Sequence, residues 1–117
     1  EALPIWRQRN SNGVLTLVVL TEMEQVVGTG SLIIEHKFLH RGGRIGHIED
    51  VAVHPNAQGQ GIGSVVIKHL IEAAKGMRCY KVILSCNDKN IPFYEKLGFH
   101  KHDNGMRIDL PTIVEHH

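Results

Sequence analysis

A strand that leads through a glycine-rich turn straight into a helix constrains the fold of this chain more than any other feature. The segment 46–63 reads GHIEDVAVHPNAQGQGIG, and its first part, His47 to His54, is rich in β-branched residues typical of a strand. Pro55 ends the strand, because proline cannot donate to a sheet ladder. Glycines follow at alternate positions, and the apolar spacing beyond them predicts a helix that ends near Gly76.

The predicted helix has one apolar stripe and one polar face, because its apolar residues recur at three- and four-residue intervals. A helix of this kind packs against a sheet, and a strand on either side of it favours a parallel crossover. The stripe consists of Ile62, Val66, Leu70, Ala73, Ala74 and Met77, and the polar face of Ser64, Lys68, Glu72 and Lys75.

The junction of turn and helix has the properties of an anion site. The first turn of a helix leaves backbone N–H groups without partners, and the helix dipole adds partial positive charge. Glycines allow a phosphate or pyrophosphate to approach closely. The turn lacks the Lys-Ser or Lys-Thr of a P-loop, and its G-x-G-x-G spacing differs from that of a dinucleotide fold. From these residues alone, a pyrophosphate site and a merely tight turn are equally open.

The turn Gln58–Gly63 resembles the Q/R-x-x-G-x-G/A signature of GNAT N-acetyltransferases, whose loop holds the pyrophosphate of acetyl-CoA. Further segments are similar to one subfamily, the eukaryotic-type glucosamine 6-phosphate N-acetyltransferases. These segments are LIIEHKFLH at 32–40, GHIEDVAV at 46–53, CYKVILSC at 79–86 and FYEKLGF at 93–99. The resemblance extends over residues 13–110, which is nearly the whole chain.

The resemblance implies an α/β (α+β) protein with the GNAT fold, a mixed and mostly antiparallel sheet with one parallel β-α-β crossover. We expect a single domain over residues 1–114 in which the family's N-terminal strand and helices are absent or truncated, and residues 115–117 resemble the start of a histidine tag. Residues 1–12 are interpreted as the tail of a helix and residues 36–46 as a loop. Strands are expected at 14–20, 26–34, 47–54, 79–86, 99–102 and 106–110, and a short helix at 90–97.

Glu49 and Asp50 are adjacent acids in an otherwise apolar strand. They face opposite sides of a regular strand, and a β-bulge, which the family has here, would turn both towards one cleft. Acetylation of an amine needs a base that takes a proton from the acceptor. Because a buried acid is costly without a purpose, we expect both to be catalytic, with Glu49 as the base. The alternative is that one of them simply faces solvent.

The resemblance also assigns the contacts to acetyl-CoA. Backbone groups after the two acids would hold the pantetheine arm, and the Tyr94 hydroxyl would give a proton to the leaving thiolate. Taken alone, Tyr94 has the pattern of a core aromatic, and Lys96 that of a solvated helix-end cation. The implied contacts are Val51, Ala52, Val53, Gln58, Gly59, Gln60, Gly61, Ile62, Gly63, Ser64, Asn90, Tyr94 and Lys96.

The acceptor side departs from the subfamily at two positions. Ser85 stands where the family usually has an acid, and Asp109 stands where fungal and animal members place an arginine for the phosphate. Arg107, two residues earlier on the same strand face, is the candidate replacement. The acceptor contacts that we expect are Lys37, Phe38, Leu39, His40, Glu49, Asp50, Ser85 and Arg107.

Composition excludes several other classes. The 13 Lys and Arg balance 12 Asp and Glu, so the large basic field of a nucleic-acid-binding protein is absent. No apolar run approaches the ~18 residues of a membrane span. Cys79 and Cys86 lie in one predicted strand on opposite faces, so they cannot pair there, and two free buried thiols predict a reducing, cytoplasmic location. Despite nine histidines, no zinc-site spacing occurs, and we expect no metal.

The expected activity is transfer of acetyl from acetyl-CoA to the amine of glucosamine 6-phosphate by direct attack in a ternary complex. The product, N-acetylglucosamine 6-phosphate, leads to UDP-N-acetylglucosamine. The resemblance also implies a homodimer that exchanges its last strand, here Met106 to Leu110. Two alternatives stay open: an acetyltransferase for another small amine or a peptide, and a non-catalytic acyl-CoA-binding module.

Overall fold

The computed structural model of the chain describes residues 5–11, 14–20, 25–37 and 43–111. These residues divide into two compact units, one before and one after the boundary at residues 86 and 87. The first unit holds a sheet and a long helix. Its elements are β1 (Ile5–Ser11), β2 (Val14–Leu20), β3 (Val26–Lys37), β4 (Gly43–Val53), the 3-10 helix η2 (Pro55–Ala57), α1 (Ile62–Gly76) and β5 (Cys79–Ile83).

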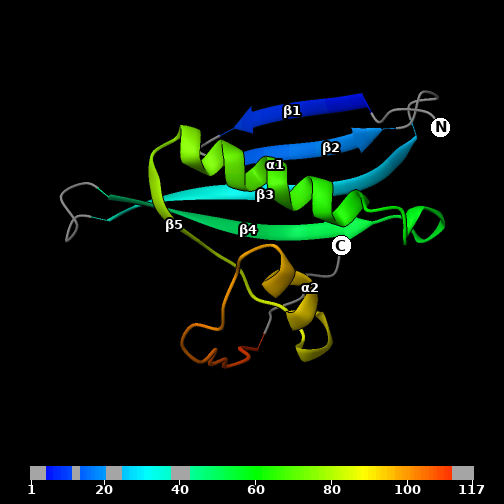
Figure 1. Ribbon diagram of the computed structural model, residues 1–117. Coiled ribbons are helices and arrows are strands. Elements are labelled where there is room, and N and C mark those ends of the chain that lie inside the picture. The colour runs from blue at the N-terminus through cyan, green and yellow to red at the C-terminus, as the bar shows by residue number, and fades with distance from the viewer. Residues whose placement is uncertain (1–4, 12–13, 21–24, 38–42, 112–117) are drawn as a thin grey trace, which may run out of the picture. The chain divides into compact units, whose positions relative to one another are not determined.

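The five strands form one mixed sheet in the order β1-β2-β3-β4-β5. The pairs from β1 to β4 are antiparallel, and β4 and β5 are parallel, with Arg44 opposite Cys79 and His47 opposite Ile83. Helix α1 is the crossover between the two parallel strands, and it lies along one face of the sheet (Figure 1). The mixed sheet with one parallel crossover, which the glycine turn predicted, is confirmed.

Helix α1 packs on the sheet through a narrow apolar stripe, and small residues on the strands let it come close. A Cβ atom added at Gly30 would lie 2.7 Å from Cγ1 of Val66 and 2.9 Å from Cδ1 of Leu70. Gly28 stands in the same relation to Ile62, the first residue of α1. Among the described residues, the largest fully buried side chains are Leu32 on β3 and Val66, Ile67 and Leu70 on α1.

Replacing Gly30 by alanine is expected to lower the free energy of unfolding by about 1–3 kcal/mol, because the new methyl group overlaps the side chains of Val66 and Leu70. Gly76 at the end of α1 has open space around its Cβ position, so Gly76→Ala serves as the matched control and should be neutral or stabilising by up to about 1 kcal/mol. Urea denaturation of both variants measures the difference. Equal midpoints for the two would contradict this packing.

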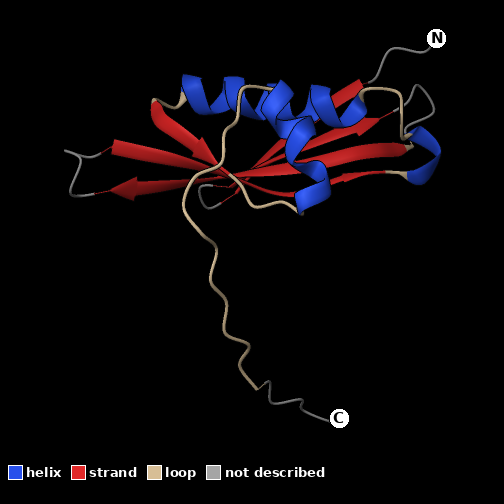
Figure 2. Cartoon of the chain, turned by 60° about the horizontal axis from the view of Figure 1, so that its bottom comes forward, coloured by secondary structure: helices blue, strands red, loops and turns tan. Residues whose placement is uncertain are grey.

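The second unit contains a short helical turn followed by irregular chain (Figure 2). A 3-10 helix, η3 (Asp88–Asn90), leads into α2 (Ile91–Lys96), and Gly98 ends the helix with a left-handed φ of 101°. Within this unit the Tyr94 ring makes edge contacts with Phe93 and Phe99, at centroid separations of 4.9 and 5.8 Å. The backbone N–H of Phe99 also donates to the Tyr94 carbonyl, at 3.2 Å.

Several expected elements differ in the structure. Residues 5–11 form a strand paired with β2 and not a helix tail, because their backbone forms a full ladder from Ile5–Leu20 to Ser11–Val14. The expected loop at 36–46 is shorter, since β3 extends to Lys37 and β4 begins at Gly43. The expected strands at 99–102 and 106–110 are wrong, because residues 99–111 carry no strand pairing. Alternation alone does not make a strand without a ladder partner.

Smaller corrections concern α1 and α2. Met77 was expected in the buried stripe of α1, but it lies beyond the helix and is 39% exposed, whereas Ile67, which the stripe omitted, is fully buried. Asn90 takes the N-cap position of α2, yet its side chain makes no capping hydrogen bond. The connection at 21–24 lies outside the described residues. Among the residues that are described, no helix is both long and apolar enough to cross a membrane.

Candidate functional site

The glycine turn before α1 is open on the side where a ligand would approach the helix. Gly59 and Gly61 adopt left-handed backbone angles, φ 83° and 76°, and Gly61 is the N-cap residue of α1. A Cβ atom added at either glycine would have no neighbour within 4 Å. The first turn of α1 carries no acidic residue. An open backbone and the positive end of a 15-residue helix fit the pyrophosphate of acetyl-CoA.

The turn is anchored to the sheet at its other end through η2. The backbone N–H of His54 donates to the Val27 carbonyl at 2.8 Å, and Asn56 N–H donates to Nδ1 of His54 at 3.1 Å. Beside these groups lies a pocket of about 520 Å³. Its lining residues are Gln25, Val26, Val27, His54, Asn56, Ala57 and Gln60.

Strand β4 contains a β-bulge at the two expected catalytic acids. Glu49 is opposite Ser31 and Ala52 is opposite Thr29, so two residues, Asp50 and Val51, face one residue of β3. Asp50 has a φ of 54°, a left-handed angle that this bulge imposes. Both acids are exposed, not buried, so the cost of burying a charge was the wrong reason to expect a function there.

Beyond the bulge, β4 keeps one side of its backbone free of strand pairing within the described residues. The ladder between β4 and β5 covers only Arg44 to His47 on β4, whereas the ladder with β3 continues to Val53. The stretch 48–53 therefore presents N–H and C=O groups along its β5 side to a ligand. The predicted contacts to the pantetheine arm, Val51, Ala52 and Val53, lie in this stretch.

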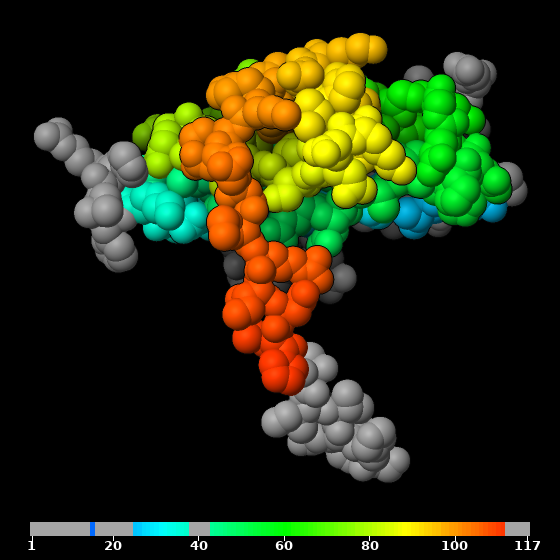
Figure 3. All heavy atoms as spheres, turned by 90° about the horizontal axis from the view of Figure 1, so that it is seen from below, coloured from blue at the N-terminus to red at the C-terminus, as the bar shows by residue number. Residues whose placement is uncertain are grey.

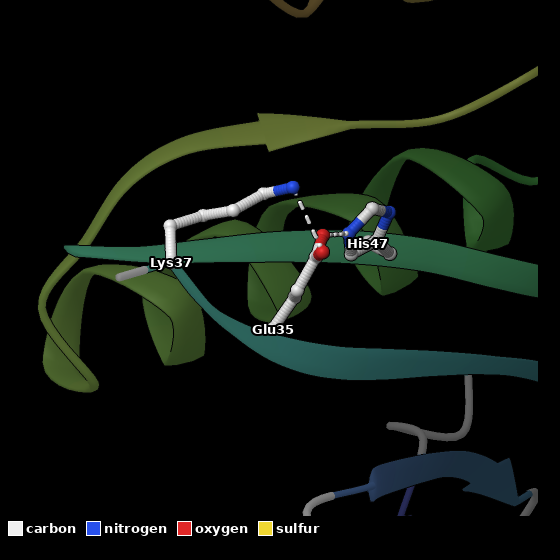
Figure 4. Close-up of polar contacts among 3 residues, drawn as sticks. All are labelled: Glu35, Lys37 and His47. Carbon is white, nitrogen blue, oxygen red and sulfur yellow. Dashed lines mark hydrogen bonds and ion pairs between the residues drawn. The ribbon is translucent and has the colours of Figure 1, made fainter. Parts of the chain in front are cut away.

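A cluster of three polar side chains lies on the sheet face opposite α1 (Figure 4). A carboxylate oxygen of Glu35, Oε2, is 2.9 Å from Nζ of Lys37, and the other, Oε1, is 2.7 Å from Nε2 of His47. A Cβ atom added at Gly46, the neighbour of His47, would lie 3.3 Å from Cβ of Ala74 on α1, so the alternation along β4 places His47 on the other face. Because an ionised carboxylate only accepts hydrogen bonds, Nε2 of His47 carries a proton.

The contacts within this cluster shift two pKa values. Hydrogen bonds from Lys37 and then from His47 lower the pKa of the Glu35 carboxyl below its usual value. The Glu35 hydrogen bond and charge, with a smaller contribution from Tyr80, raise the pKa of Lys37. The lowered pKa means that Glu35 stabilises the fold above its unfolded pKa and loses that contribution as the pH falls through its folded pKa.

Replacing Lys37 by methionine is expected to raise the pKa of the Glu35 carboxyl back towards its usual value, because the first cause of the shift is removed. A ¹³C NMR titration of the side-chain carboxyls measures this directly. Lys75→Met, which breaks an exposed 3.1 Å pair with Glu72 on α1, is the control and should leave the Glu35 titration unchanged. An unshifted Glu35 titration in Lys37→Met would contradict the assigned cause.

Two other groups of expected residues lie further along the chain. In the second unit, Asn90 and Lys96 are exposed and Tyr94 is half-buried. Arg107, the expected phosphate cation, donates through Nε to Oδ1 of Asp109 at 2.7 Å, so the acid that departs from the family neutralises it. In the first unit, Ser85 is exposed beyond the end of β5.

The cysteines are free, as expected, but differ from each other. Burial, partly offset by the Arg44 guanidinium, raises the pKa of Cys79. Cys86 was expected inside a buried strand, yet β5 ends at Ile83 and the thiol is exposed. Cys79 pairs with Arg44, away from the β4 bulge, and Cys86 lies beyond the end of β5. Among the described residues, no group of three or more His, Cys, Asp and Glu could hold a metal.

Most of the expected site residues thus lie in the first unit, on the consecutive elements β4, η2 and α1. Strand β4 carries Glu49, Asp50 and the three residues after them, and η2 leads from it into the turn and first residues of α1. Phe38, Leu39 and His40 lie outside the described residues. Sequence reasoning missed Glu35 and His47. The sequence holds only part of the information. The two-residue spacing of Glu35 and Lys37 places them on one face of a strand, but the register between β3 and β4 was needed to add His47.

The mixed sheet and its strand–turn–helix unit are shared with one class of protein. The model of the acetyltransferase (GNAT) family matches residues 1–99, and the chain belongs to this family. The glucosamine 6-phosphate N-acetyltransferase of Trypanosoma brucei brucei is 45% identical over 111 residues, which are 94% of this chain and 76% of that protein. The enzyme of that name from Dictyostelium discoideum is 35% identical over 106 residues, 91% of this chain and 68% of that protein.

Solved structures support the same assignment of fold. The crystal structure of glucosamine-6-phosphate N-acetyltransferase from Arabidopsis thaliana is similar with a TM-score of 0.80 at 38% identity, covering 85% of this chain and 68% of that one. A predicted acetyltransferase from Clostridium acetobutylicum, solved with acetyl-CoA, has a TM-score of 0.70 at 22% identity. It covers 84% of this chain and 65% of its own, and it shows the fold alone.

Proposed function

We propose that the chain transfers the acetyl group of acetyl-CoA to the amine of glucosamine 6-phosphate and forms N-acetylglucosamine 6-phosphate. The observation that carries this proposal is the path of β4. One strand presents Glu49 at a bulge, leaves its next residues without a partner on the β5 side, and leads into the open glycine turn. The names of the similar proteins support the choice of acceptor.

The co-substrate would be held by backbone groups more than by charge. Gln58–Gly63 and Ser64 would bind its pyrophosphate at the N-terminus of α1, and Val51–Val53 would bind the pantetheine arm. Asn90, Tyr94 and Lys96 of the second unit are further proposed contacts. When bound, acetyl-CoA supplies the acetyl group as a thioester. We propose no metal.

Proton transfer is the step that this chain's own residues must perform. The acceptor amine is protonated in water, and Glu49 would take its proton, directly or through a water molecule, so that the nitrogen lone pair can attack. Asp50 would add negative charge beside the base and the ammonium substrate. Tyr94 would donate a proton to the leaving thiolate. We propose direct transfer without an acyl-enzyme, because the Cys79 pKa is raised and Cys86 lies outside the β4 bulge.

The proposed acceptor contacts include a cation at the end of β3. Lys37 is the described member of the segment 37–40, and the register of β3 and β4 places it on the same sheet face as Glu49. Phe38, Leu39, His40, Ser85 and Arg107 complete the proposed contacts. We also propose that the protein acts in the cytoplasm and that residues 1–114 form a single domain.

The C-terminal segment supports a homodimer that exchanges strands. Met106, Ile108 and Leu110 alternate along the chain and are 92%, 83% and 73% exposed. They belong to an extended stretch without ladder partners in the described residues, drawn in orange to red in Figure 3. We propose that this stretch pairs with the sheet of a second copy of this chain, because apolar residues at every second position fit a sheet face.

Replacing Ile108 by glutamate should give a monomer in light scattering. A monomer mass of the wild-type protein at all concentrations would refute the dimer.

The decisive test of function is release of free coenzyme A from acetyl-CoA with glucosamine 6-phosphate or with unphosphorylated glucosamine. We expect fast release with the phosphorylated sugar alone. An acetyltransferase for another small amine is the second candidate, favoured by the 2.7 Å Arg107–Asp109 pair that neutralises the expected phosphate cation. Release with other amines but not with the sugar phosphate would select it. Binding of acetyl-CoA without turnover of any amine would leave an acyl-CoA-binding module.

A further inference from the structure

The Lys37 side chain is held in one direction by Glu35. This acid has no part in the proposed proton transfer or in the proposed contacts to acetyl-CoA and the acceptor. Glu35 lies two residues before Lys37 on β3, on the same sheet face, and bonds Nζ of Lys37 at 2.9 Å. His47 on β4 donates to the other carboxylate oxygen at 2.7 Å. The carboxylate is therefore fixed from the neighbouring strand, and it in turn fixes the ammonium (Figure 4).

The direction of Lys37 matters because its backbone lies far from the proposed base. Across the ladder Lys37 is opposite Gly43, six residues before Glu49 on β4. At ~3.3 Å per residue this separation is roughly 20 Å. An extended Lys37 side chain could add to that distance, since four flexible methylene groups allow the ammonium to leave the sheet in any direction.

Glu35 turns the ammonium back along the sheet towards the base. Lys37 bends towards Glu35 and His47 in Figure 4. His47 is opposite Ile33 and Glu49 is opposite Ser31, so both side chains lie on the same face of β4, two residues or ~7 Å apart. The Lys37 ammonium and the His47 ring therefore bind the same Glu35 carboxylate. This brings the ammonium from the end of β3 to the side chain of His47, two residues before Glu49 on β4.

We infer that Glu35 is a positioning residue that sets the separation between Lys37 and Glu49 and thereby selects an acceptor with an amine and a phosphate at opposite ends of one sugar ring. This inference rests on the proposed function. An ammonium has three N–H donors, so the bond to Glu35 leaves donors for phosphate oxygens. Holding the side chain in place beforehand also removes rotamer entropy that binding would otherwise have to overcome.

The test compares Glu35→Gln, Lys37→Met and the double variant. Glutamine keeps the shape of Glu35 and an oxygen for His47 but loses the charge that holds Lys37. We expect Glu35→Gln to raise the KM for glucosamine 6-phosphate about fivefold, the size of an exposed ion pair, with kcat and the KM for acetyl-CoA unchanged. The slow turnover expected with unphosphorylated glucosamine, measured as kcat/KM, should not change. The double variant should be no weaker than Lys37→Met alone, because Glu35 acts through Lys37.

Glu72→Gln is the matched control, since it breaks a similar exposed Glu–Lys pair, 3.1 Å long, on the other side of the sheet. The Kd for glucose 6-phosphate, which has no amine to acetylate, gives a second readout and should also rise about fivefold in Glu35→Gln. An unchanged or tighter Kd, an equal loss with glucosamine, or full additivity with Lys37→Met would overturn the inference.

This second readout separates the inference from the proposed function. If the wild-type protein binds glucose 6-phosphate but releases no coenzyme A with glucosamine 6-phosphate, the proposed activity fails and the variants are judged on Kd alone. If the wild-type protein does not bind glucose 6-phosphate, Glu35 positions no phosphate-binding cation, and the inference fails whichever amine is acetylated.

Discussion

Replacing Glu49 by glutamine is expected to lower kcat for acetyl transfer by about 10²- to 10⁴-fold, the range typical for loss of a general base. Glu49 lies at the bulge of β4, where Asp50 and Val51 face a single residue of β3. Glutamine keeps the size and the hydrogen-bonding oxygen but cannot accept the proton from the acceptor ammonium. The KM for acetyl-CoA should stay unchanged, because the proposed co-substrate contacts are backbone groups further along the chain.

Two further variants make the Glu49 result specific. Asp50→Asn is conformationally matched, since asparagine tolerates the left-handed φ of 54° at that position, and it should lose less activity than Glu49→Gln. Glu72→Gln on α1 should behave as the wild type. If acetyl transfer by Glu49→Gln recovered at high pH, where the amine loses its proton to solvent, the role as base would be supported. Wild-type kcat at neutral pH in Glu49→Gln would refute that role.

Replacing Leu70 by alanine is expected to lower the free energy of unfolding by about 2–5 kcal/mol. The Leu70 side chain is fully buried, and its Cδ1 atom lies 2.9 Å from the Cβ position of Gly30, so helix and sheet are in close contact there. Removal of the side chain leaves a cavity that the surrounding strands can fill only in part. Against a typical domain stability of about 5–15 kcal/mol, this is a large loss.

Urea denaturation followed by circular dichroism measures the Leu70 effect. Lys68→Ala on the exposed face of α1 is the control, and it should change the unfolding free energy by no more than about 0.5 kcal/mol. If Leu70→Ala does not fold, Ile67→Val at another fully buried position gives a smaller expected loss of about 0.5–1.5 kcal/mol. A loss below 1 kcal/mol for Leu70→Ala would show that α1 is not the main cover of this sheet face.

The element around which the fold is built was predictable because its signals are local. Glycine spacing, the proline after the strand and the three- to four-residue apolar rhythm together predicted α1, which the structure places at Ile62–Gly76. β2 was predicted with the observed bounds, Val14–Leu20, because a β-branched run between turns needs no distant partner to be recognised. The parallel crossover followed from the order of these elements.

The errors occurred where a residue's environment depends on a distant strand. The acids Glu49 and Asp50 were expected to be buried, but exposure is decided by what covers the strand. Residues 106–110 alternate as a strand should, yet a strand exists only when another strand completes its ladder. Residues 5–11 lack a strong pattern of their own and become β1 through pairing with β2.

The sequence by itself thus determined the family, the strand–turn–helix unit and the acids and glycines that the proposed chemistry uses, because these depend on neighbours within a few residues. The family resemblance implied the bulge at Glu49, which the register of β3 and β4 confirms. Only the tertiary structure decided the unpaired side of β4 and the cluster of Glu35, Lys37 and His47. The physical reason is register: which side chains meet across two strands depends on how the strands pair, and a shift of one residue would move every side chain to the other face.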